Sequence, residues 1–147
     1  MMLALTVFAC TPAPQTSTTP PAGSKMPSSV VDPYLKIQTA LSQDRIDDVR
    51  ANAGDVAKAA TALGAPAMKI DTAAVQLASA TELPDAREKF GTLSDAIVAY
   101  MDGLHLAPPE GVRKAYCPMA SKPWLQKGET LANPYYGQSM LTCGEFQ

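Results

Sequence analysis

The chain has 147 residues, 46% of them apolar and 18% charged, with a formal net charge of −2. This length and composition are typical of one globular domain. The charge gives no support for nucleic-acid binding, which needs a clustered basic face. No apolar run approaches the roughly 18 residues that cross a bilayer, so no transmembrane helix is expected.

The N-terminus predicts a lipoprotein signal peptide over residues 1–10. Its sequence, MMLALTVFAC, is apolar and ends in Val7-Phe8-Ala9-Cys10. This ending resembles a bacterial lipobox, with an aliphatic residue at −3, a small residue at −1 and the lipid-bearing cysteine at +1. Cys10 is therefore the expected lipidation site. The alternative is an apolar N-terminus in which Cys10 is a free thiol.

Residues 11–30 are expected to form a disordered tether between the lipid and the folded domain. They are rich in Pro, Ser and Thr and offer too little apolar surface to fold. Thr11, which follows Cys10, is not the aspartate that retains many lipoproteins in the inner membrane. The expected location is extracytoplasmic, on the outer membrane facing the periplasm, with the lipid as the only membrane contact.

Residues 31–147 are expected to form one all-α domain, an antiparallel up-down four-helix bundle over about residues 32–106 with a tail over 107–147. Asp32-Pro33 predicts the first helix start, because a capping oxygen precedes a proline at the first helical position. A second helix is expected from about Ser42, and its apolar residues recur every three or four positions at Ile46, Val49, Ala53, Val56, Ala60 and Leu63.

Two more helices are expected before the tail. The third carries Met68, Ile70, Ala74 and Leu77, and the fourth opens at Pro84-Asp85 and carries Phe90, Leu93, Ile97, Tyr100 and Leu104. No segment alternates apolar and polar residues as a half-buried strand does. The tail is therefore expected to be irregular and to pack its cysteines, methionines and aromatic residues on the bundle.

The simplest interpretation of the tail is a disulfide between Cys117 and Cys143. Lipid on Cys10 would leave these two as a pair in an oxidising compartment. The bond would stabilise the small bundle by about 3.5 kcal/mol in the chain-entropy model. Trp124 would then be a packing residue.

The other interpretation is a soft-metal site formed by Cys117, Met119, Met140 and Cys143. Thiolate and thioether ligands favour Cu(I). In an extended strand Cys117 and Met119 point to the same side, and one helical turn brings Met140 and Cys143 onto one face. Zinc is less favoured, because structural zinc sites use Cys and His rather than Met.

Three further residues are secondary candidates for such a site. Trp124 would shield the ion or offer its ring as a cation–π partner. His105 is the only histidine in the chain, and Met101 lies four residues before it. A histidine at a helix end is more often a solvated cation, which the helix dipole favours there.

The tail also resembles a known family. The residues YCPMA, WLQKG, NPYYG and ML-CG, between Tyr116 and Gly144, are similar to the signature of an uncharacterised bacterial family of extracytoplasmic helical domains. Its members occur alone or fused to periplasmic adaptor subunits of copper/silver efflux pumps. The resemblance covers residues 31–147 and implies a role in handling copper or related metals, with periplasmic components of a metal-efflux system as partners.

No enzyme is expected. The sequence has no phosphate-binding glycine loop, no nucleophile elbow and no HExxH motif, and a Cys117–His105 pair would lack an oxyanion arrangement. The favoured function is an extracytoplasmic lipoprotein that binds a soft metal, with Cu(I) as cofactor, near an efflux system. The alternative is a disulfide-stapled helical module, without metal, that binds a protein partner.

Overall fold

The computed structural model describes residues 18–147, so the signal peptide, Cys10 and the first part of the expected tether lie outside the described residues. The helices are α1 (Ser28–Ser42), α2 (Val49–Leu63), α3 (Met68–Ala78) and α4 (Leu83–Leu104), with short 3₁₀ turns η1 (Ala65–Ala67) and η2 (Gly137–Met140). The strands are β1 (Val112–Cys117), β2 (Lys122–Lys127) and β3 (Glu145–Phe146). Within the described residues, no helix is long and apolar enough to cross a membrane.

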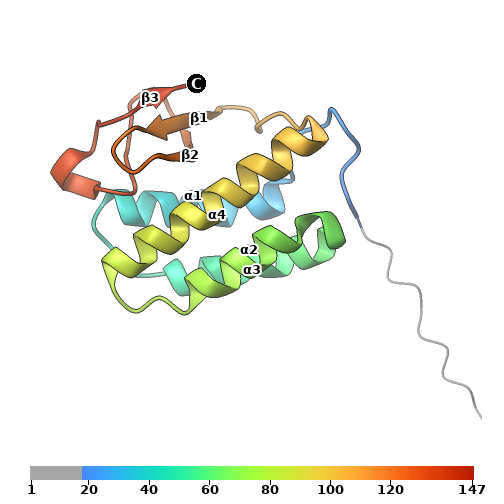
Figure 1. The fold of residues 1–147 in the computed structure, drawn as a ribbon, viewed down its shortest axis with the longest axis horizontal. Coiled ribbons are helices and arrows are strands. Elements are labelled where there is room, and N and C mark those ends of the chain that lie inside the picture. Colours follow the sequence, from blue (N-terminus) through green and yellow to red (C-terminus); the bar gives the residue numbers. More distant parts are fainter. Residues whose placement is uncertain (1–17) are drawn as a thin grey trace, which may run out of the picture.

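The four helices pack together, and the sheet covers one side of them (Figure 1). Along the chain, α1 packs on α2, α2 on α3 and α3 on α4, while β2 packs on α4 and α1. The helices α1 and α4 therefore form a middle layer between the sheet and the α2–α3 pair. This middle layer is buried on two sides.

Alanines let the helices approach closely. The apolar stripe expected on the second helix is confirmed from Val49 onward, with Ala53, Val56 and Ala60 fully buried. Small side chains at such contacts bring helix axes near one another but bury little area each. Met68, expected on the apolar face of the third helix, is instead 63% exposed at the start of α3.

The expectation of an all-α protein with an irregular tail is wrong, because the tail carries a three-stranded antiparallel sheet in the order β2-β1-β3. In the hairpin, Val112 pairs with Lys127 and Cys117 with Lys122. The short β3 pairs with the other edge of β1, placing Phe146 opposite Ala115. The fold is α+β, with four packed helices followed by a small sheet.

The absence of apolar–polar alternation did not predict this hairpin, because β2 is covered on both faces. Trp124, Leu125 and Gln126 are all buried in succession. The backbone N–H of Leu125 donates to the hydroxyl of Tyr34 on the helical side, at 3.1 Å, and the rest of the tail covers Trp124. A strand buried on both faces shows a continuous run of buried residues rather than an alternation of apolar and polar residues.

The second part of the expected tether is also different from the expectation. From residue 18 onward it follows the helices, and the N–H of Thr18 donates to the carbonyl of Ala62 at 3.0 Å. Lys25 forms a bridge with Ala107, in which the N–H of Met26 donates to the Ala107 carbonyl at 2.8 Å. The Met26 side chain is 1% exposed, so the folded region begins well before residue 31.

Helix α1 begins at Ser28, one turn before the start expected at Asp32-Pro33, and Pro33 lies inside it. The extra turn buries Val30 and Val31 completely or nearly so. Pro33 removes the N–H that would bond to the carbonyl of Ser29, an exposed position where water can replace it. Burial of two valines outweighs the loss of one helical hydrogen bond.

Replacing Met26 tests whether the segment before α1 belongs to the core. Met26→Ala is expected to lower the free energy of unfolding by about 2–5 kcal/mol, as other buried Met-to-Ala changes do. Urea unfolding followed by circular dichroism measures it. The matched control is Met68→Ala, whose side chain is 63% exposed and which should change stability by less than about 0.5 kcal/mol. Equal effects of the two substitutions would contradict the assignment.

Replacing Trp124 tests whether sheet and helices unfold together. Trp124 is fully buried, and Trp124→Ala is expected to cost about 3–5 kcal/mol. Helical ellipticity and tyrosine fluorescence should lose their native values at one urea concentration in the parent chain. Lys127→Ala, at an exposed position of the same strand, is the control. Two separate transitions would show that the tail folds independently.

Candidate functional site

Cys117 ends β1, and its sulfur is enclosed by backbone and side-chain N–H groups. The hairpin turn (residues 118–121) folds back so that the N–H of Ala120 donates to Cys117 Sγ at 3.4 Å. Asn133 Nδ2 donates to the same sulfur at 3.3 Å. Cys117 has no exposed surface. Two N–H donors aimed at a sulfur favour electron density on it, as hydrogen bonds around metal-bound thiolates do.

Cys143 lies beside Cys117, just before β3. Its N–H donates to the carbonyl of Met140 at 3.0 Å, which closes a turn after η2. Burial raises the pKa of the Cys143 thiol, and contact with the Cys117 side chain raises it further. The two cysteines are not bonded to each other. They form a pair of adjacent thiols, called the cysteine pair below.

Asn133 joins the two cysteine segments through its fully buried amide. Its Nδ2 donates to Cys117 Sγ and to the carbonyl of Cys143, the latter at 2.7 Å. Its Oδ1 accepts the backbone N–H of Tyr135 at 2.8 Å and that of Tyr136 at 3.3 Å. The Asn133 side chain thus joins the hairpin, the segment before β3 and the turn at Tyr135 and Tyr136.

Trp124 packs against the segment that carries Cys143 and Gly144. Its indole N–H donates to Gln126 Oε1 at 2.9 Å, and Gln126 also accepts the N–H of Ala132. Gly144 lies against the indole, where a Cβ would stand 2.7 Å from Trp124 Cη2 and 2.9 Å from the Tyr116 carbonyl. Its φ of +139° also favours glycine. The ring is a packing residue that presses the Cys143 segment onto β1.

A second set of contacts fixes the tail to the helices. Arg87 of α4 forms an ion pair with Asp44 and donates to the carbonyls of Leu41 and Pro134. Gly137 lies directly against this ion pair, with a φ of +54°. The contacts hold η2, and therefore the segment that leads to Cys143, at the N-terminal end of α4.

The structure brings together Cys117 and Cys143 but not all four expected ligands. Met140 is half-buried in the same turn as Cys143. Met119 lies in the hairpin turn and is 62% exposed, so its thioether does not close a cluster around the buried Cys117 sulfur. Among the described residues there is also no group of three His, Cys, Asp or Glu side chains that could hold a metal.

The secondary candidates lie elsewhere or are already bonded. His105 is exposed just after α4, in the left-handed conformation. Met101 is buried near the beginning of β1, where a pocket joins it to Val112. The length of β1 separates Met101 from Cys117, by about 16 Å at 3.3 Å per residue. Trp124 is near the cysteine pair, but its N–H bonds to Gln126.

The sequence reasoning missed Asn133, Gln126, Arg87 and Asp44 as organising residues. An asparagine before a proline indicates a turn, and its side chain can bond the backbone that follows it. Asp44 was expected in the first turn of the second helix, whereas α2 begins at Val49 and Asp44 adopts a φ of +56° in the preceding loop. A charge pair between distant segments leaves no periodic signal.

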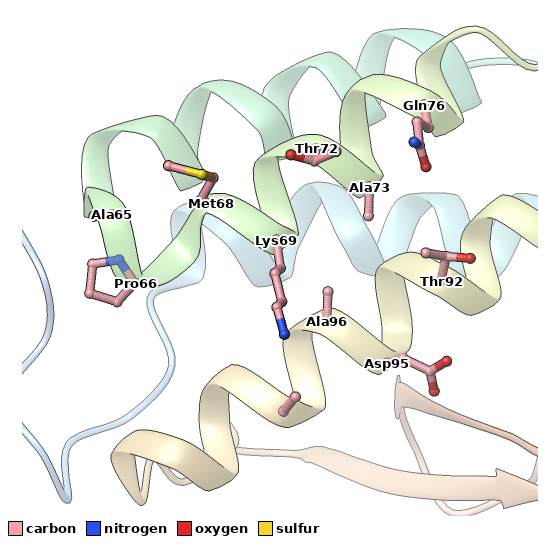
Figure 2. Close-up of a pocket in the computed structure, with 11 residues that line it drawn as sticks. Ala65, Pro66, Met68, Lys69, Thr72, Ala73, Gln76, Thr92, Asp95 and Ala96 are labelled. Carbon is pink, nitrogen blue, oxygen red and sulfur yellow. The ribbon is translucent and has the colours of Figure 1, made fainter.

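A surface groove on the helices contains neither cysteine in its lining. A groove of about 680 Å³ runs between α3 and α4 (Figure 2), and Lys69 reaches across it from α3. Its walls are mostly small, with Ala73 from α3 and Ala96 from α4 among them. It holds no cysteine and one methionine, Met68, so its lining offers little soft-metal chemistry.

No protein-family model, no curated protein and no solved structure matches this chain. The resemblance to the efflux-associated family therefore rests on the quoted tail residues alone.

Two glycine substitutions test how the tail docks on the helices. Gly137→Ala is expected to destabilise by more than about 1 kcal/mol, because alanine is strained at positive φ and its Cβ would overlap Asp44 and Arg87. Gly103→Ala, inside α4 with nothing within 4 Å, is expected to stabilise by up to about 1 kcal/mol. Urea unfolding of both variants measures the difference. The same sign for the two changes would contradict the docking geometry.

Proposed function

We propose that this protein is an extracytoplasmic lipoprotein that binds Cu(I) through the cysteine pair, in copper homeostasis near a metal-efflux system. Cys117 and Cys143 supply the two thiolates, and Met140, in the same turn as Cys143, supplies a thioether. Such a role needs no catalysis, and its partners are periplasmic components of the efflux system. Lipid on Cys10 is the proposed anchor.

The observation that carries the proposal is the environment of the Cys117 sulfur. It accepts two N–H hydrogen bonds, from Ala120 and Asn133, and lies in contact with the Cys143 thiol. N–H donors around a thiolate stabilise its charge and fix its position, which are the tasks of outer-shell groups at metal sites. A soft thiolate pair with a thioether beside it selects Cu(I) over harder ions.

The contact between the Cys117 and Cys143 thiols also supports a second function, in which they form a disulfide. Two adjacent thiols in an oxidising compartment also form disulfides. In that case Cys117 and Cys143 would fasten the tail, and the protein would be a helical interaction module without metal. The α3–α4 groove, with its apolar walls and the exposed Met68 at one end, is the surface that such a module would offer (Figure 2).

Copper titration tests the proposed site. Reduced, oxygen-free protein should take one Cu(I) per chain from a coloured Cu(I) chelate. Cys117→Ser and Cys143→Ser should each weaken that affinity by at least about 100-fold, because even outer-shell changes cost about 10- to 100-fold. Cys143 is half-buried, so its serine variant should keep the fold, which circular dichroism checks.

The control is Cys10→Ser, which removes the third cysteine and leaves the cysteine pair unchanged. Its Cu(I) affinity should equal that of the parent chain. Parental affinity in both Cys117→Ser and Cys143→Ser would refute the site. Thiol titration after aerobic purification without reductant separates the two functions, because free thiols at these positions support metal binding and a bonded pair supports the module.

A further inference from the structure

The exposed thioether of Met119 lies in the turn that encloses the Cys117 sulfur. The N–H of Ala120 donates to that sulfur, and Ser121 Oγ donates to the Pro118 carbonyl at 3.4 Å. Both bonds close the four-residue turn that contains Met119. The backbone of Met119, two residues after Cys117, is therefore fixed by the turn. Its side chain is 62% exposed.

The sulfur atoms around the site differ in how far they are open to solvent. Cys117 is completely buried, Cys143 and Met140 are half-buried, and Met119 is mostly exposed. Met119 therefore offers the sulfur that is most open to solvent in the hairpin. The Cys117 sulfur, which accepts the N–H groups of Asn133 and Ala120, is the least open.

A thioether differs from a thiol in its proton chemistry. A cysteine must lose a proton before it ligates a metal as thiolate, whereas a neutral thioether has no proton to lose. A methionine can therefore take Cu(I) from a carrier in a single ligand exchange. Because it adds no charge, it holds the ion more weakly than a thiolate pair does and releases it readily.

We propose that Met119 is the capture ligand of the cysteine pair: it takes Cu(I) from a small-molecule or protein carrier and passes it inward. This inference rests on the proposed function. A bond from the carrier to Cu(I) breaks as the Met119 Sδ–Cu bond forms. Cys143 and then Cys117 replace the thioether, each releasing one proton to solvent, and copper stays in the +1 state throughout. Met119 sets the rate of loading, and the cysteines set the affinity.

The chain offers a matched control for this role. Met68 is 63% exposed, almost the same as Met119, but it lies on α3 at the groove and away from the cysteines. Figure 2 shows its side chain at the outer edge of that groove. Met119→Leu and Met68→Leu are near-isosteric changes at exposed positions that should spare the fold. A difference between them reports position rather than the loss of any methionine.

The experiment is stopped-flow transfer of Cu(I) from a coloured bathocuproine-type chelate to the reduced full chain, with equilibrium affinity measured by competition. Met119→Leu is expected to slow transfer about tenfold, or about 1.4 kcal/mol of lost transition-state stabilisation, while the affinity stays within about twofold. Met68→Leu should match the parent chain in both measurements.

The alternative outcomes are distinct. An unchanged transfer rate in Met119→Leu would overturn the capture role. A loss of affinity as large as the loss in rate would make Met119 a permanent ligand, which also overturns it. If Cys117→Ser and Cys143→Ser bind Cu(I) as the parent does, the proposed function itself fails. That result is separate, because it does not involve Met119.

Discussion

The buried amide of Asn133 is the contact on which the rest of the tail depends. It satisfies a sulfur, a carbonyl and two backbone N–H groups, all of them buried or partly buried. An unsatisfied polar group in such a place costs about 1–3 kcal/mol. A network of this kind is stable only when every member is bonded, so it enforces one arrangement of the hairpin and the chain end. The cysteine pair is brought together as part of that arrangement.

The helices gain from this tail as much as they support it. Their contacts are rich in alanine, which buries little area, and a domain of this size has a thin margin of stability. The sheet adds Trp124, and Tyr135 lies in edge contact with it at 6.1 Å between ring centroids. On the helical side Tyr34 stacks on Phe90 at 4.9 Å. The aromatic contacts of the molecule therefore gather where sheet and helices join.

The sequence allowed good prediction of periodic features and poor prediction of the others. The stripe on α2 and the buried face of α4 follow a helical repeat, and the structure confirms them from Val49 and through Ile97. The hairpin could not be predicted in this way, because β2 is covered on both faces and so lacks alternation. The part of the site that depends on Asn133 and Arg87 comes from contacts between distant segments, which no local pattern records. The prediction that Cys117 and Cys143 act together rests on residue type alone, because no periodic pattern relates residues this far apart in sequence.

The path of the N-terminal segment decides how the molecule would stand on a surface. Thr18 bonds to the end of α2, and Gly23 bonds to Leu104 at the end of α4. The hairpin turn that holds Met119 lies by the opposite end of α4, where Ala120 and Lys122 share a pocket with Pro84 and Arg87. With 22 residues in α4, the two ends are about 33 Å apart. If Cys10 carries a lipid as proposed, the lipid joins the folded region on the side of Thr18, whereas the cysteine pair lies toward the other end of α4.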